Sequence, residues 1–232
     1  MKRPEALQLD AARAFARGGN RLCFVDPRDS QRCIKVQRPD RSPQDKRRSA
    51  PPWKRLRSTR SFDDNQQEAM IYRLIQAHCG EAAFALVPRL HGFVPTSLGP
   101  GLCSELIRDG DGRISRTLKH YLWARGDTAS LQGILADFAG QWTGLGMPSR
   151  RLLLHNIVVQ CDADGPRALK VIDGLGWPDF LPLANHIPAL ARRKARSRVM
   201  HLQQAIITLL ARREANGDFG IHGWLDESRR RC

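Results

Sequence analysis

The stretch LLLHNIVVQCDADGPRALKVIDGLG, Leu152 to Gly176, contains two apolar runs separated by a polar turn, which predicts a β-hairpin. Asn156 stands at the entry of the first strand and Asp173 at the exit of the second, so both are expected at one end of the hairpin. An amide and a carboxylate on adjacent strand ends can share a divalent metal ion that bridges phosphates. The ordinary alternatives are a loop cap for Asn156 and a common turn dipeptide for Asp173-Gly174.

Helical periodicity surrounds this hairpin on both sides. From Thr128 the apolar residues follow a 3.6-residue period, which predicts a long helix with one broad buried face. A basic helix is predicted from about Pro188 to Ala215. The apolar positions that define these two helices are Leu131, Ile134, Leu135, Phe138, Trp142 and Leu145 in the first, and Val199, Leu202, Ile206 and Leu209 or Leu210 in the second.

The N-terminal half is predicted to be rich in strands. Leu22–Val25 and Cys33–Val36 form an early hairpin around DPRDSQ, and FALVPRLHGFV and GLCSELIRD supply two later strands. Between these pairs, DDNQQEAMIYRLIQAH carries Met70, Ile71, Leu74 and Ile75 as the apolar stripe of an amphipathic helix. The stretch RGGN before the first strand has two glycines, Gly18 and Gly19, which allow backbone to approach a ligand closely, although a plain turn explains them as well.

This order of elements predicts an α+β protein with two lobes. Residues 1–108 form a small β-rich N-terminal lobe, and residues 109–232 form a mostly helical C-terminal lobe with one hairpin. A polar link, GDGR at residues 110–113, joins them. A cleft between two lobes is where a ligand normally binds.

Two charged residues of the N-terminal half fit phosphate chemistry. Lys35 alternates with Ile34 and Val36, so its side chain faces away from theirs, and Glu68 lies on the following helix. A Lys held by a Glu can grip phosphate oxygens. Taken singly, Lys35 is also explained as a solvent-facing strand residue, and Glu68 as part of a capping box with Asn65.

The formal charge of +15 is unevenly distributed. Between Arg38 and Arg60 nine Lys or Arg face Asp40 and Asp45, a local charge of +7 within a predicted basic insertion at residues 37–60. Such a surface attracts phosphates or an acidic or phosphorylated partner, and a solvated basic linker is the alternative. Nucleic acid is not favoured, because there is little aromatic interleaving beyond Trp53.

The remaining composition describes an ordinary globular chain. No run of about 18 apolar residues predicts a transmembrane helix, and the start is no signal peptide, so a soluble cytoplasmic protein is expected. The six cysteines form no C-x-x-C pair and several lie in apolar strand patterns, which favours reduced core thiols.

Several motifs together resemble one bacterial family. They are RGGNRLCFVDPRDSQRCIKV, NQQEAMIYRL, GPGLCSELIRDGDGRISRTLKHYL, HNIVV, VIDGLG and DFLPLANHIPALARRK, and they span most of residues 17–198. The chain is similar in these motifs to the YrbL family, the PhoP regulatory network proteins, which resemble protein kinases. The resemblance implies a protein kinase-like fold that binds ATP and Mg²⁺.

The resemblance also implies a role for individual residues. Gly18 and Gly19 match an abbreviated glycine loop, Lys35 the lysine that grips ATP, and Glu68 its helix partner. Glu105 to Ile107 match the hinge, so Glu105 and Ile107 are expected to contact the nucleotide. Asn156 and Asp173 match the pair that binds Mg²⁺.

The chain departs from kinases where a catalytic base is expected. Kinases place an Asp five residues before the metal-binding Asn, and this position is Arg151 here. GMPSRRLLLHN contains no acid, and His155 is expected on the strand face opposite to Asn156. No Ala-Pro-Glu sequence follows IDGLG. The catalytic residue is therefore left unassigned.

Three functions remain open from the sequence. The first is a nucleotide-binding protein with weak or unusual phosphotransfer, or with a regulatory role. The second is a pseudokinase scaffold that binds no nucleotide. The third is a basic protein that binds nucleic acid or an anionic envelope component.

Overall fold

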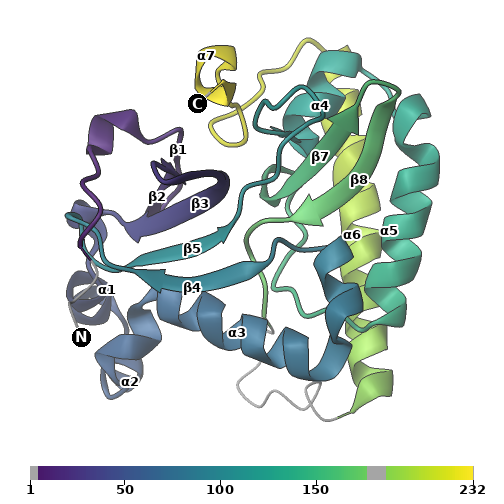
Figure 1. Ribbon diagram of the computed structural model, residues 1–232. Coiled ribbons are helices and arrows are strands. Elements are labelled where there is room, and N and C mark those ends of the chain that lie inside the picture. The colour runs from purple at the N-terminus through teal and green to yellow at the C-terminus, as the bar shows by residue number, and fades with distance from the viewer. Residues whose placement is uncertain (1–4, 177–186, 232) are drawn as a thin grey trace. The chain divides into compact units, whose positions relative to one another are not determined.

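The computed structural model describes residues 5–176 and 187–231 (Figure 1). The chain divides into two compact units. Among the described residues, the first comprises 5–73 and 89–106, and the second comprises 74–88, 107–176 and 187–231. The predicted stretch DFLPLANH, residues 179–186, lies outside the described residues.

The first unit is built on a five-stranded sheet with the order β1-β2-β3-β5-β4, in which every neighbouring pair is antiparallel. Its longest strands, β2 and β3, form the early hairpin that the sequence predicted, with only Pro27 and Arg28 between them. The strands are β1 Ala16–Arg17, β2 Arg21–Asp26, β3 Asp29–Gln37, β4 Leu90–Val94 and β5 Gly101–Glu105.

The two faces of the β2–β3 hairpin differ in chemistry. The cross-strand pairs Phe24 with Ile34 and Leu22 with Val36 lie on one face, where their side chains are buried. They pack with Leu7, Ala14 and partly buried apolar residues into one hydrophobic cluster. Because side chains alternate along a strand, Lys35, which is paired with Cys23, points to the other face. The apolar cluster therefore fixes the strand that carries Lys35.

The basic segment, which is the insertion predicted at residues 37–60, is folded into short helices. They are the 3-10 helices η2 Pro39–Arg41 and η3 Thr59–Phe62 and the α-helices α1 Pro43–Ser49 and α2 Pro52–Arg55. The Ser42 hydroxyl caps α1 by accepting from the Asp45 amide, and Lys46 pairs with Asp64 at 2.7 Å. The segment therefore has local structure, and its side chains are exposed or half-buried, so the alternative of a solvated basic linker stays open.

Helix α3, Asp64–Cys79, follows the basic segment and crosses the boundary between the two units. Its buried side is formed by Asn65, Glu68, Ala69, Tyr72 and Ile75. The predicted stripe is thus partly wrong, since the side chain of Met70 is 45% exposed. Asn65 and Glu68, at the start of α3, pack toward the sheet. The buried face of the helix therefore includes polar residues and differs from the purely apolar face that was predicted. A short 3-10 helix, η4 Glu81–Ala85, comes next.

The second unit combines a small sheet with helices. Strands β6 Arg116–Thr117, β7 Ile157–Asp162 and β8 Gly165–Val171 form a sheet of order β6-β7-β8, in which β7 and β8 are the predicted hairpin. The helices are α4 Leu118–Arg125, η5 Ala129–Leu131, α5 Gln132–Gly144, η6 Leu154–Asn156, α6 Pro188–Glu214 and α7 Glu227–Arg230. Helices α5 and α6 run side by side (Figure 1).

The core of the second unit confirms the predicted helical faces. Phe138 and Trp142 of α5 are buried and stacked, with ring centroids 5.2 Å apart. The buried residues of α6 are Ala191, Ala195, Val199, Leu202, Ile206 and Leu209. The sequence did not predict α4 or β6, yet Leu118 and Leu122 of α4 are completely buried.

The α+β class is confirmed, with a mainly β N-terminal region and the longer helices in the later part of the chain. Of the described helices, none is long and apolar enough to span a membrane. Among the described cysteines, Cys23, Cys33, Cys79, Cys103 and Cys161, none forms a disulfide.

Candidate functional site

Lys35 and Glu68 form a buried ion pair inside the first unit. Lys35 Nζ on β3 lies 2.7 Å from Glu68 Oε1 on α3. The exposed fraction is 6% for Lys35 and 9% for Glu68. The ammonium group is therefore held away from bulk solvent and oriented by a carboxylate that comes from another element.

Two further polar residues complete this cluster: Arg21, which no motif of the sequence indicated, and Asn65, which the sequence indicated only as a helix cap. The guanidinium of Arg21, at the start of β2, donates to Glu68 Oε2 and, at 3.4 Å, to Asn65 Oδ1. Asn65 Nδ2 in turn donates to the Lys35 carbonyl at 2.9 Å. One carboxylate is thus shared by two buried cations, and an amide ties the helix to the strand backbone.

The same contacts exclude the capping box considered for Asn65 and Glu68. The amides of Asn65 and Gln66 donate to Asp63 Oδ1 at 2.9 and 3.2 Å, so Asp63 caps the helix. The side chains of Asn65 and Glu68 point toward the sheet instead. Two features of the sequence could have indicated this cluster. Asn65 and Glu68 are polar residues three positions apart on α3, and Arg21 precedes Cys23 by two residues.

The neighbouring thiol of Cys33 is not a nucleophile. A hydrogen bond with Cys23, followed by burial, raises the pKa of Cys33 well above its ordinary value. Because the thiolate is the reactive form, this cysteine stays protonated and inert at neutral pH.

Gly18 and Gly19 form the turn between β1 and β2. The Gly18 amide donates to the Arg21 carbonyl at 2.8 Å, and the Arg38 guanidinium donates to both glycine carbonyls, at 3.3 and 3.1 Å. Neither glycine has a positive φ, and a Cβ on Gly19 would meet no atom within 4 Å. The backbone conformation of this turn therefore allows a residue with a side chain at position 19.

Glu105 and Ile107 lie on either side of the unit boundary. In the first unit, Glu105 ends β5, where its amide donates to the Arg89 carbonyl at 2.7 Å and its carboxylate accepts from the Arg89 amide at 3.0 Å. In the second unit, the Ile107 carbonyl accepts from the Ser115 amide at 3.0 Å. Both residues thus have an ordered backbone.

Asn156 and Asp173 lie at the same end of the β7–β8 hairpin, in the second unit. The Ile172 amide donates to the Asn156 carbonyl at 2.8 Å, which joins the two strand ends. Asp173 is exposed, and its Oδ1 accepts from the Gly174 amide at 2.6 Å. Gly174 has a φ of 80°, and a Cβ there would lie 3.1 Å from Asn156 Nδ2, so a close approach and a left-handed backbone both favour glycine.

These two side chains supply oxygen ligands that suit Mg²⁺. Magnesium is usually held by one or two protein carboxylates, with water and phosphate oxygens completing the shell. No cluster of three or more His, Cys, Asp or Glu that could hold a metal ion occurs within residues 5–176 and 187–231. An Asn–Asp pair is therefore compatible with a metal ion that arrives with a phosphate ligand, and less so with a metal bound by protein alone.

The segment before Asn156, where the resemblance to kinases led us to expect a base, contains Arg151 and His155. Arg151 is exposed, and its carbonyl approaches Gly174. His155 lies in the 3-10 helix η6 and not in a strand, so the expected placement on an opposite strand face was wrong in its premise. Burial lowers the pKa of His155, and His222 and Lys119 lower it further, whereas Asp173 raises it. Its imidazole is therefore neutral over a wider pH range than a free histidine.

A C-terminal segment packs on this histidine. The rings of His155 and His222 have centroids 5.4 Å apart, and Lys119 Nζ donates to the His222 carbonyl at 2.8 Å. Thr117 Oγ1 donates to the Gly223 carbonyl at 2.6 Å. No local motif of the sequence indicated this contact, because more than 60 residues separate the two histidines.

The predicted residues thus fall into two groups. Gly18, Gly19, Lys35, Glu68 and Glu105 belong to the first unit, and Ile107, Asn156 and Asp173 belong to the second.

A family model described as "PhoP regulatory network protein YrbL" matches residues 7–206.

The chain belongs to the YrbL family.

Two proteins that carry the family's name are similar to this chain. The protein named "Uncharacterized protein YrbL" from Escherichia coli (strain K12) is 26% identical over 183 residues, which cover 77% of each chain. The protein of the same name from Shigella flexneri matches with the same identity and coverage.

Proposed function

We propose that this YrbL-family protein has a protein kinase-like fold and binds ATP with Mg²⁺, and that it uses the nucleotide for regulation or for slow phosphotransfer. The observation that carries the proposal is the buried ion pair between Lys35 on β3 and Glu68 on α3. A strand lysine fixed by a helix glutamate is the arrangement that protein kinases use to hold the α- and β-phosphates of ATP.

A purely structural role explains this pair less well. Desolvation of two charges offsets most of their attraction, so a buried ion pair adds little stability compared with apolar side chains of similar volume. The opposite side of the same hairpin already supplies an apolar cluster that holds the sheet. A lysine kept in one orientation is therefore better explained by a ligand that needs its charge.

Asn156 and Asp173 are the proposed magnesium ligands. They stand at one end of the β7–β8 hairpin, and Asp173 is exposed. A bound Mg²⁺ would neutralise charge on the phosphates of the nucleotide. The protein's part is to position the amide and the carboxylate.

Slow turnover follows from the region around Arg151. A general base typically accelerates such a reaction 10²–10⁴-fold, about 3–5 kcal/mol of barrier, whereas positioning and charge neutralisation carry much of phosphoryl transfer. The segment 146–156 offers His155 as its only ordinary base, and it contains no carboxylate. Regulation by nucleotide binding therefore fits these residues better than rapid phosphorylation of a substrate.

Arg151 also favours a second candidate, a scaffold with a kinase-like fold that binds no nucleotide. At the position where kinases carry the catalytic Asp, this chain has a guanidinium group. A guanidinium cannot act as the base that phosphotransfer uses, so a scaffold role needs no catalysis from this site. The two candidates differ in one measurable property, which is whether ATP and Mg²⁺ bind.

Nucleotide binding is tested by calorimetry and by thermal unfolding with ATP and MgCl₂. At 100 times the Kd, ATP should stabilise the protein by about 2.7 kcal/mol, which raises the Tm by roughly 5–10 °C. Lys35→Ala and Asp173→Asn should abolish binding. Arg32→Ala on the same strand and Asp164→Asn at the opposite end of the same hairpin are matched controls that should bind normally.

Two results would overturn the proposal. The first is the absence of a thermal shift at millimolar ATP with Mg²⁺, which favours the nucleotide-free scaffold. The second is unchanged affinity in both Lys35→Ala and Asp173→Asn, which places the nucleotide elsewhere.

A further inference from the structure

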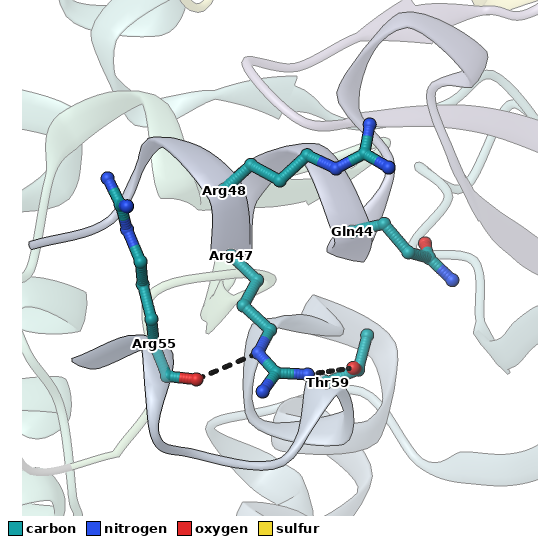
Figure 2. Close-up of a pocket in the computed structure, with 5 residues that line it drawn as sticks. All are labelled: Gln44, Arg47, Arg48, Arg55 and Thr59. Carbon is teal, nitrogen blue, oxygen red and sulfur yellow. Dashed lines mark hydrogen bonds between the residues drawn. The ribbon is translucent and has the colours of Figure 1, made fainter. Parts of the chain in front are cut away.

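The basic segment of the first unit contains a hollow of about 390 Å³ on its surface. Figure 2 shows the side chains around it, which come from α1, α2 and η3. They are Gln44, Arg47, Arg48, Arg55 and Thr59. The lining residues include three guanidinium groups and no carboxylate.

Two of these arginines are held in place by backbone carbonyls. Arg47 Nε donates to the Arg55 carbonyl at 2.8 Å, and its Nη1 donates to Thr59 Oγ1 at 3.3 Å (Figure 2). Arg55 Nε donates to the Ala50 carbonyl at 2.7 Å. These contacts orient the guanidinium groups without neutralising them, so the surface keeps its positive charge.

The guanidinium groups do not converge on one point. In Figure 2 the side chains of Arg48 and Arg55 extend to opposite sides of the hollow, while Arg47 turns toward Thr59. Arg48 Nη1 lies 3.9 Å from Asp45 Oδ1, which is a long ion pair between exposed side chains. The arrangement fits an array of phosphates better than a single phosphate ion.

Apolar side chains stand exposed beside these charges. Trp53 is 60% exposed and Leu56 is 88% exposed, and they are three residues apart at helix α2. Lys54 Nζ lies 4.9 Å from the centre of the Trp53 ring. An indole and a leucine flanked by Lys and Arg are the combination that peripheral proteins insert at the boundary between lipid headgroups and acyl chains.

We propose that this surface, Gln44–Thr59, docks the protein on an anionic phospholipid membrane. The arginines contact headgroup phosphates, and Trp53 and Leu56 enter the interface. A nucleic acid would also attract the arginines, but it offers no apolar phase for Leu56. The lipid surface accounts for the charge and the exposed apolar side chains together.

The experiment measures co-sedimentation of the full chain with vesicles at about 0.15 M salt. One set contains equal amounts of phosphatidylglycerol and phosphatidylcholine, and the other contains phosphatidylcholine alone. Arg48→Ala/Arg55→Ala should lower the partition coefficient on anionic vesicles roughly 30-fold, since each cation near an anionic surface contributes about 1 kcal/mol. Arg193→Ala/Arg196→Ala, which removes the same charge from an exposed side of α6, should change it little.

A second variant separates lipid from other polyanions. Trp53→Ala/Leu56→Ala should lower partition on anionic vesicles roughly 10-fold, and this loss should persist at high salt because apolar contacts are not screened. The same variant should leave affinity for duplex DNA unchanged. Circular dichroism checks that each variant keeps the helical content of the native protein.

Three results would overturn the proposal. Equal losses in the Arg48/Arg55 and Arg193/Arg196 variants would mean that only net charge matters. Unchanged vesicle binding in the Trp53/Leu56 variant, with duplex DNA displacing the protein from vesicles, would assign the surface to nucleic acid. Equal binding to phosphatidylcholine alone would remove the requirement for anionic lipid.

Discussion

Replacing Glu68 with Gln is expected to destabilise the protein more than replacing Lys35 with Met. The Glu68 carboxylate accepts from two buried cations, Lys35 and Arg21. Its neutralisation therefore weakens the position of both charges at once. Removal of Lys35 leaves Glu68 with the Arg21 guanidinium, so the carboxylate keeps a cationic partner.

The contacts give a magnitude to each change. Breaking a buried ion pair so that a charge loses its partner costs about 3–5 kcal/mol, which applies to Glu68→Gln. Loss of one hydrogen bond between charged groups costs about 1.5–3 kcal/mol, and the apolar methionine offsets part of this in Lys35→Met. Against a typical total of about 5–15 kcal/mol, the difference between the two variants is measurable.

Urea denaturation followed by circular dichroism provides the assay, with a double-mutant cycle between the two positions. The combined variant should be less destabilised than the sum of the single variants, by about 1–3 kcal/mol, because Lys35 is no longer present to lose its partner. Arg21→Met should behave like Lys35→Met. An equal or larger loss of stability in Lys35→Met than in Glu68→Gln would refute the shared-carboxylate reasoning.

Three further predictions follow from buried groups and close contacts. Burial and nearby guanidinium groups lower the pKa of His120. The free energy of unfolding should therefore decrease by up to about 1.4 kcal/mol per pH unit as the pH falls below 6.5, the ordinary pKa of histidine. Measured against pH, this slope should be flatter in His120→Gln. Gly101→Ala should cost about 1–3 kcal/mol in urea denaturation because a Cβ would lie 2.5 Å from an isoleucine methyl group, whereas Gly19→Ala should be nearly neutral. Arg230→Met should lower the Tm strongly, since this guanidinium donates to two carboxylates and a carbonyl from a position that is 3% exposed, and Arg229→Ala should not.

The sequence predicted those elements whose apolar residues have a clear period. The β2–β3 and β7–β8 hairpins, α5 and α6 are all found near their predicted positions, because alternation and a 3.6-residue period are local properties. Strand β6 has only two residues and exists through its pairing with β7, where Arg116 lies opposite Val159. Such a strand depends on a partner far along the chain, so no local pattern reveals it.

The candidate site divides in the same way. The contact between Lys35 and Glu68 is present as the order of strand and helix predicted, and its role in holding ATP stays a prediction. Arg21 was missed, and Asn65 was interpreted only as a helix cap, because both join the cluster only after β2, β3 and α3 pack together. The start of α3 was ambiguous, since the run Asp63-Asp64-Asn65 offers three adjacent capping residues and only the backbone geometry selects Asp63.

The position of the basic segment explains how so many cations fit between β3 and α3 without disturbing the Lys35–Glu68 pair. At the base of the insertion, Gln37 Nε2 donates to Asp63 Oδ1 at 3.0 Å and joins the end of the strand to the helix cap. Lys46 Nζ then donates to Gln37 Oε1 at 3.3 Å and to Asp64 Oδ2 at 2.7 Å. These contacts join the two ends of the insertion to each other. Repulsion among the exposed arginines therefore acts within the insertion, and the strand and helix that hold the buried pair keep their relative position.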